Sequence, residues 1–86
     1  MHCQRFGLDV HITRHARERM VQRWVSDAEL AKLLETGELR YKDEQRLWVA
    51  KAFKGRCDNL ICIAVTLEDR LVVKTVMHHF SWEVEG

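Results

Sequence analysis

The feature that most constrains this chain is a change in the spacing of its apolar residues at Gly37. Before it, Leu30, Leu33 and Leu34 have the i, i+3, i+4 spacing of an amphipathic helix. After it, apolar residues alternate with polar ones or form short runs between polar turns, as strands do. Helices followed by closely linked strands predict an α+β domain, with two helices packed on a three- to four-stranded antiparallel meander.

The second helix has the clearer boundaries. Ser26 and Glu29 form the S-x-x-E capping box, in which each side chain satisfies a free backbone amide at the helix start. Gly37 has the position of a left-handed helix stop. These signals predict a helix over Asp27–Thr36.

A first helix is predicted between Thr13, which suits its N-cap, and about Trp24. Ala16, Met20 and Trp24 are spaced to form its buried stripe. The alternation in Leu8–Ile12 predicts a short edge strand before it.

The remaining strands are expected at residues 39–42, 46–53, 60–67 and 70–80, joined by polar turns. In the last strand, alternation predicts that one set of side chains faces the helices and the other faces away. The predicted helix-facing set is Leu71, Val73, Thr75, Met77 and His79, and the opposite set is Val72, Lys74, Val76, His78 and Phe80.

Composition fits one small globular domain over residues 1–86, with its core within 8–80 and short flexible termini. The 86 residues are 47% hydrophobic and 31% charged. No apolar run approaches the roughly 20 residues that a membrane helix needs, and the start has no apolar signal core. We therefore expect a cytoplasmic protein without membrane contact. The odd number of cysteines, three, predicts reduced thiols.

The net charge of +1 hides a basic N-terminal region. Residues 1–25 contain five arginines and two acidic residues, whereas residues 26–46 contain four basic and six acidic residues. A basic region of this kind is compatible with an anionic partner such as RNA.

His15, Arg19 and Arg23 are spaced i, i+4, i+8 and would share one face of the first helix. Arginine donates two hydrogen bonds to phosphate at once, and histidine exchanges protons near neutral pH. This face is therefore a candidate for phosphate chemistry, with Arg14 as a further phosphate contact; it also fits an ordinary solvated helix face.

Two site geometries follow from the predicted last strand. In one, a cleft between the first helix and this strand gathers His15, Arg19, Thr75 and His79. In the other, the open face of the sheet presents Lys74 and His78. We favour the first, because it uses the helix residues.

Other chemistries have little support in the sequence. His11 and His15 have H-x-x-x-H spacing, but residues 10–13 read as strand and no carboxylate completes a zinc site at helical spacing. No Gly-x-Ser-x-Gly elbow and no glycine-rich phosphate loop is present. We expect neither a metal nor a cofactor.

Metal-independent RNA cleavage fits the remaining residues. The 2′-hydroxyl of RNA attacks its own phosphate if a base takes the proton, an acid protonates the leaving oxygen and cations stabilise the phosphate. Tyr41, Trp48, Phe53 and Trp82 are candidates for stacking unpaired bases, although aromatic residues are more often part of the core.

The motif H-A-x-x-R-M-x-x-R, starting at His15, resembles that of a family of small uncharacterised bacterial domains. The resemblance continues through Val25-Ser26, the leucine-rich helix, Gly37 and the strand segment at 72–76, and covers residues 11 to about 80. That family is grouped with the barnase, EndoU, colicin and RelE-like nucleases, many of which are toxins that cleave RNA without a metal.

The resemblance implies a RelE/ParE-like two-layer fold and a site at His15, Arg19 and Thr75, with Arg23 in a structural or phosphate-binding role. The chain departs from the pattern at His78 and His79. An antitoxin or immunity protein is the implied partner. The alternatives are a toxin-related module that binds a protein or nucleic acid without turnover, and an inactive domain that forms oligomers through its sheet edge.

Overall fold

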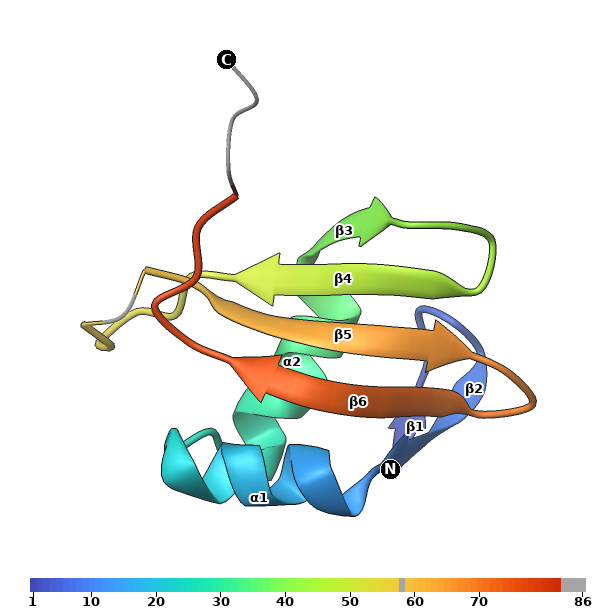
Figure 1. Cartoon of the computed structure of the whole chain (residues 1–86), viewed down its shortest axis with the longest axis horizontal. Helices are drawn as coiled ribbons and strands as arrows, with labels where there is room; N and C mark the ends of the chain where they lie inside the picture. Colours follow the sequence, from blue (N-terminus) through green and yellow to red (C-terminus); the bar gives the residue numbers. More distant parts are fainter. Residues whose placement is uncertain (58, 83–86) are drawn as a thin grey trace.

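The computed structural model describes residues 1–57 and 59–82 and has two helices packed on a curled six-stranded sheet (Figure 1). The α+β class is confirmed. The strand order in the sheet is β1-β2-β6-β5-β4-β3. The elements are β1 (His2–Cys3), β2 (Leu8–Ile12), α1 (Arg14–Gln22), α2 (Asp27–Thr36), β3 (Glu38–Tyr41), β4 (Arg46–Lys51), β5 (Ile61–Leu67) and β6 (Leu71–Met77).

The four C-terminal strands form the predicted antiparallel meander. The predicted edge strand at Leu8–Ile12 is β2, and the unpredicted β1 brings the sheet to six strands. β2 joins the meander by pairing in parallel with β6, from which it is separated by most of the chain. β1 pairs with β2 across a turn in which Gly7 has a φ of 66°. A strand of two residues has no apolar period to read, and parallel pairing leaves no local sequence signal.

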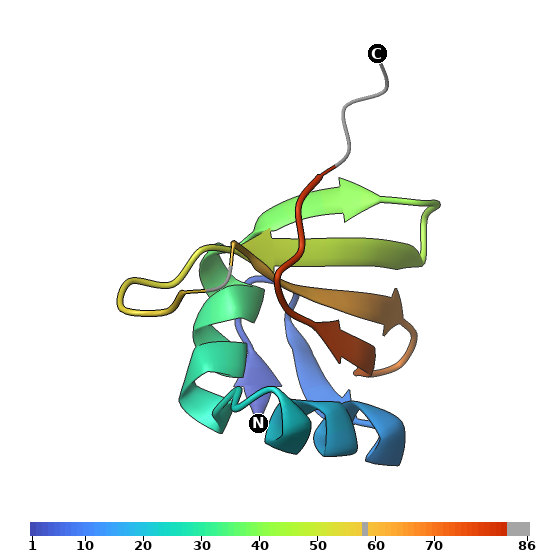
Figure 2. The ribbon, with the colours of Figure 1, turned by 60° about the vertical axis from the view of Figure 1, so that its left-hand side comes forward.

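Both helices pack on the same core of the curled sheet, α1 along β6 and α2 against β4 (Figure 2). The Thr13 hydroxyl caps α1 by accepting a hydrogen bond from the Ala16 N–H at 3.1 Å, as predicted. The same hydroxyl donates to the Val73 carbonyl at 3.0 Å, which ties the start of α1 to β6. The capping box of α2 is also confirmed. Among the described residues, neither helix is long and apolar enough to cross a membrane.

The first helix ends earlier than predicted. α1 stops at Gln22, and Trp24 has a φ of 53° and is 86% exposed. Ala16 and Met20 are buried as expected, but the placement of Trp24 on their buried stripe is wrong, because the left-handed backbone turns its side chain into solvent.

Gly37 ends α2 by a different mechanism from the one predicted. Its φ is −70°, so the position is not left-handed. A Cβ here would lie 2.6 Å from the Leu33 carbonyl oxygen and 2.7 Å from Cγ1 of Val49. Glycine is therefore required by the close approach of α2 to β4.

The alternation of β6 is interrupted by one extra residue. Val73 pairs with Val65 and Thr75 pairs with Ala64, so Lys74 is a β-bulge. Leu71 and Val73 face the helices as predicted, but so does the fully buried Val76. The predicted faces of residues 75–77 are therefore wrong: Thr75 and Met77 lie on the open face.

The residues at the two ends of the predicted last strand lie outside β6, which stops at Met77. Segment 78–82 leaves the strand, and the Phe80 N–H donates to the Leu60 carbonyl at 3.1 Å. In Figure 1 this segment crosses the side of the sheet opposite α2. Of the flexible end predicted after residue 80, residues 83–86 lie outside the described residues, whereas Trp82 packs against Trp48 and Phe80.

Gly37→Ala should lower the free energy of unfolding by about 1–3 kcal/mol, because the added methyl must displace a backbone carbonyl and a packed core side chain. Urea denaturation followed by circular dichroism measures the change. Lys32→Ala, at an exposed position of α2, is the control and should change stability by less than about 0.5 kcal/mol. Equal midpoints for Gly37→Ala and wild type would contradict the packing argument.

The three thiols should differ sharply in reactivity. Cys3 and Cys62 are 1% and 0% exposed, whereas Cys57 is exposed. Burial raises the pKa of Cys3 and raises that of Cys62 to about 12, so neither forms the reactive thiolate near neutral pH. Titration with a chromogenic disulfide should detect one thiol in the native protein and three after denaturation. Rapid native reaction of a second thiol would show that the core opens easily.

Candidate functional site

The predicted helix residues lie on the outer side of α1 but do not all reach a pocket. His15 is exposed, and exposed Arg14 pairs with Glu18 at 3.4 Å. Arg19 is half-buried and donates from Nη1 to Gln22 Oε1 at 2.6 Å. Of the three residues spaced i, i+4, i+8, Arg23 alone lines a described pocket.

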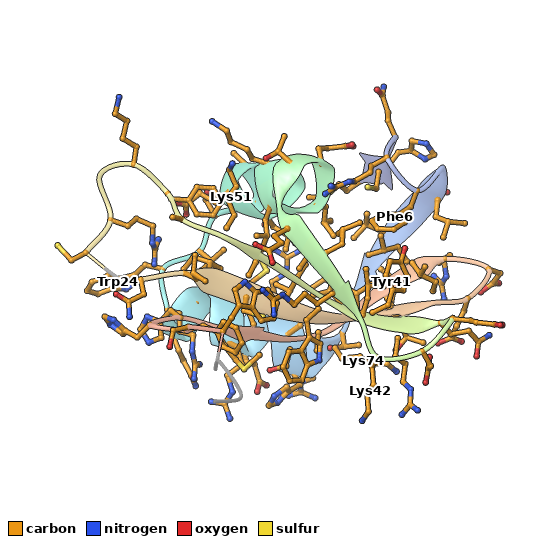
Figure 3. All side chains as sticks on the ribbon, turned by 90° about the horizontal axis from the view of Figure 1, so that it is seen from above. Phe6, Trp24, Tyr41, Lys42, Lys51 and Lys74 are labelled. Carbon is orange, nitrogen blue, oxygen red and sulfur yellow. The ribbon has the colours of Figure 1, made fainter. Side chains whose placement is uncertain are left out.

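Neither of the two predicted site geometries is present in the structure. Thr75 lies on the open face, opposite Ala64, because of the bulge. It is therefore separated by the sheet from the cleft expected to gather it with the helix residues. Exposed Lys74 lies on the side of the sheet away from α2 (Figure 3), but His78 does not join it there.

Arg23, His78 and His79 instead meet in one pocket at the end of α1. Its volume is about 560 Å³, within the range of small-ligand sites, roughly 300–1,000 Å³. We call it the histidine pocket. Its lining residues are Gln22, Arg23, Trp24, Gly55, Arg56, Cys57, His78 and His79.

The two histidines line the same pocket because the backbone turns after β6. Neighbouring residues of a continuous strand would point to opposite faces. Here β6 has ended at Met77, and His79 has a φ of 52°. The ring centroids of His78 and His79 are 4.4 Å apart, with planes tilted by 51°. The turn occurs because β6 ends at Met77, and the sequence gives no signal for a strand end at that residue.

Arg56 organises the pocket and was missed by the sequence analysis. Its Nη1 donates to the Trp24 carbonyl at 2.7 Å, and its Nη2 donates to the Arg23 carbonyl at 2.9 Å. A carboxylate oxygen of Glu29 lies 3.4 Å from Nη1. These contacts satisfy carbonyls left unpaired at the end of α1 and fix the loop after β4 against both helices.

Arg23 has unmet hydrogen-bonding capacity. Its side chain is half-buried, and its Nε is buried without a hydrogen-bond partner among the described residues. A buried donor on a cationic group is costly to leave unpaired. Because this nitrogen is buried, a ligand in the pocket would meet the charge of the guanidinium and not the Nε itself.

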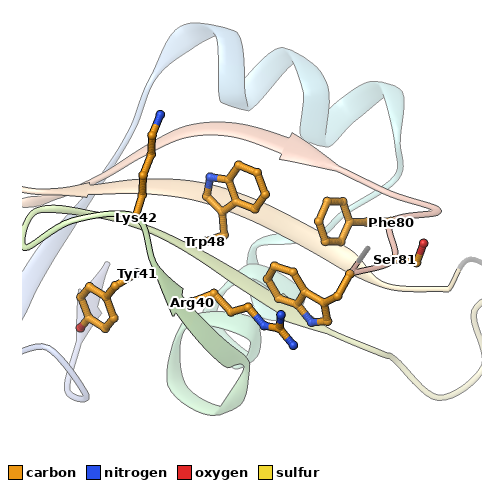
Figure 4. A pocket seen from close by; sticks show the side chains of 7 residues that line it. Arg40, Tyr41, Lys42, Trp48, Phe80 and Ser81 are labelled. Carbon is orange, nitrogen blue, oxygen red and sulfur yellow. The ribbon is translucent and has the colours of Figure 1, made fainter. Parts of the chain in front are cut away.

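A second concave surface lies on the open face of the sheet (Figure 4). We call it the tryptophan groove. Its volume is about 810 Å³, and its lining residues are Arg40, Tyr41, Lys42, Trp48, Phe80, Ser81 and Trp82. Three of the four aromatic residues proposed to stack bases lie here, whereas Phe53 packs against the core.

The structure defines a small α+β two-layer domain with a cationic histidine pocket and an aromatic groove. Within the described residues, no group of three or more histidine, cysteine, aspartate or glutamate side chains has the arrangement of a metal site. The chain belongs to the family described as "Domain of unknown function (DUF4258)", which matches residues 12–78. Comparison with curated proteins and with solved structures gives no match.

Arg56→Met should lower the free energy of unfolding by about 1–3 kcal/mol, because two backbone carbonyls lose a charged donor. Thermal or urea denaturation measures the change. Arg17→Met is the matched control, since it removes an exposed ion pair with Asp27 and should cost no more than about 1 kcal/mol. Equal losses in the two variants would argue against Arg56 as the residue that holds this corner.

Proposed function

We propose that this domain is a toxin-like, metal-independent ribonuclease that acts at the histidine pocket. The observation that carries the proposal is the convergence of two imidazoles and Arg23 in one pocket. These groups come from segments far apart in the sequence. They also match the groups that RNA cleavage by its own 2′-hydroxyl needs: a base, an acid and a cation at the phosphate.

In the proposed reaction one imidazole takes the proton of the 2′-hydroxyl as the 2′-oxygen bonds to phosphorus. The bond between phosphorus and the 5′-oxygen of the next nucleotide breaks, and the other imidazole, protonated, gives that oxygen its proton. The products are a 2′,3′-cyclic phosphate and a 5′-hydroxyl, and no co-reactant is consumed. Arg23, which lines the pocket, binds the phosphate oxygens through its guanidinium.

The remaining candidate residues take secondary roles in this proposal. His15 and Arg19 lie along the exposed side of the helix that ends at the pocket, and Arg14 extends this basic side. We assign them to contacts with RNA phosphates outside the pocket. Trp24, 86% exposed beside the pocket, is placed to contact a base.

His78→Ala and His79→Ala should each lower cleavage of a fluorescent single-stranded RNA in EDTA by about 100-fold or more, the usual size of a general acid or base contribution. The wild-type rate should have a bell-shaped pH profile, because one imidazole must be neutral and the other protonated. A 2′-deoxy residue at the cleaved linkage should stop the reaction.

His2→Ala and His11→Ala are the controls, since both positions are exposed on β1 and β2 and line neither pocket. They should cleave at the wild-type rate. Equal activity in the His78 and His79 variants, or no cleavage by wild type, would refute the ribonuclease assignment.

A non-catalytic module that binds RNA is the second candidate, and the tryptophan groove favours it. That groove combines aromatic rings with Arg40 and Lys42 but contains no histidine. Binding that weakens steeply with salt, without any product, would support this candidate. Growth arrest on induced expression, relieved by a neighbouring antitoxin gene, would support the toxin role.

A further inference from the structure

The tryptophan groove has the construction of a base-binding subsite. The rings of Trp48 and Trp82 are nearly parallel, with an interplanar angle of 13° and centroids 6.4 Å apart. Phe80 meets both rings edge-on, at 6.0 Å from Trp48 and 5.0 Å from Trp82. Trp48 is still 41% exposed, so part of its indole remains accessible to a ligand.

Cations lie beside these rings. The Arg40 guanidinium carbon is 4.3 Å from the Trp82 ring centroid, and Glu38 holds the guanidinium by a 2.8 Å hydrogen bond from Arg40 Nε. Lys42 lines the same groove, and Figure 4 shows it near Trp48. The lining residues contain two cations and no carboxylate, with Glu38 as the acidic residue next to them. This combination suits a base attached to a phosphate.

The groove and the histidine pocket are lined by consecutive residues of one segment. Segment 78–82 supplies His78 and His79 to the pocket and Phe80, Ser81 and Trp82 to the groove. The hydrogen bond from Phe80 N–H to the Leu60 carbonyl fixes the segment between the two sites. The two sites are therefore neighbours along the chain, with His79 in one and Phe80 in the other.

From these observations we infer that the tryptophan groove binds one unpaired nucleobase of single-stranded RNA, next to the linkage in the histidine pocket. The inference rests on the proposed function for its substrate class. A stacked base must expose its face, so double-stranded RNA is excluded from the groove. The subsite would position the substrate and take no part in proton transfer.

The probe is a fluorescent oligodeoxynucleotide that contains a single ribonucleotide. Variants of this probe lack the base at one of the positions next to the ribonucleotide. Fluorescence polarisation measures binding, and gel analysis measures cleavage. Trp48→Ala should raise the Kd and KM of the intact oligonucleotide about 10-fold and leave kcat within a few-fold, whereas Trp48→Phe should retain most of the affinity. Removing the base at one of these neighbouring positions should raise the Kd of the wild-type protein by a similar factor. It should leave the Kd of Trp48→Ala unchanged.

Lys32→Ala, at an exposed position of α2 that lines neither pocket, is the control, and circular dichroism checks that each variant is folded. If no linkage is cleaved, the ribonuclease proposal fails, but the binding measurement still tests the groove. Equal Kd values for wild type and Trp48→Ala, or equal binding of duplex and single strand, would overturn the subsite. Loss of kcat without a change in Kd would also overturn it, because the groove would then act in the chemistry.

Discussion

The fold depends on burying both halves of β6 against the helix layer. A regular strand would alternate, and Val73 and Val76, three residues apart, would then lie on opposite faces. The bulge at Lys74 resolves this conflict, so that both valines are fully buried. It also sends Thr75 to the open face. This one extra residue therefore determines which side chains of β6 face the core and which face solvent.

Around this core, the chemically useful side chains lie where regular structure ends. Trp24 and His79 both have positive φ, and each directs a ring to the surface at the histidine pocket. Such conformations persist when neighbouring contacts hold them. Arg56 holds the first through the Trp24 carbonyl, and the bond from Phe80 to Leu60 fixes the chain after the second.

The helix caps and the antiparallel meander could be predicted from the sequence, whereas the bulge and the parallel pairing could not. The cap at Thr13 and the capping box at Ser26 depend on residues within one helical turn, and both formed as predicted. The arrangement of β6 depends on a bulge and on parallel pairing with β2. Neither feature produces a periodic pattern of apolar residues in the sequence. For the same reason the predicted grouping of the site residues was wrong: His79 lies with Arg23, while Thr75 lies across the sheet.

The two arginines of the histidine pocket illustrate why geometry is needed to separate support from function. Arg56 donates hydrogen bonds to two backbone carbonyls and lies beside Glu29, so its charge is compensated within the fold. Arg23 has a buried Nε without an acceptor among the described residues. Removing a cation from water without a partner is unfavourable, and an anion in the pocket would compensate the charge of the Arg23 guanidinium. On this argument Arg56 shapes the pocket, and Arg23 is the group to which a bound phosphate would be drawn.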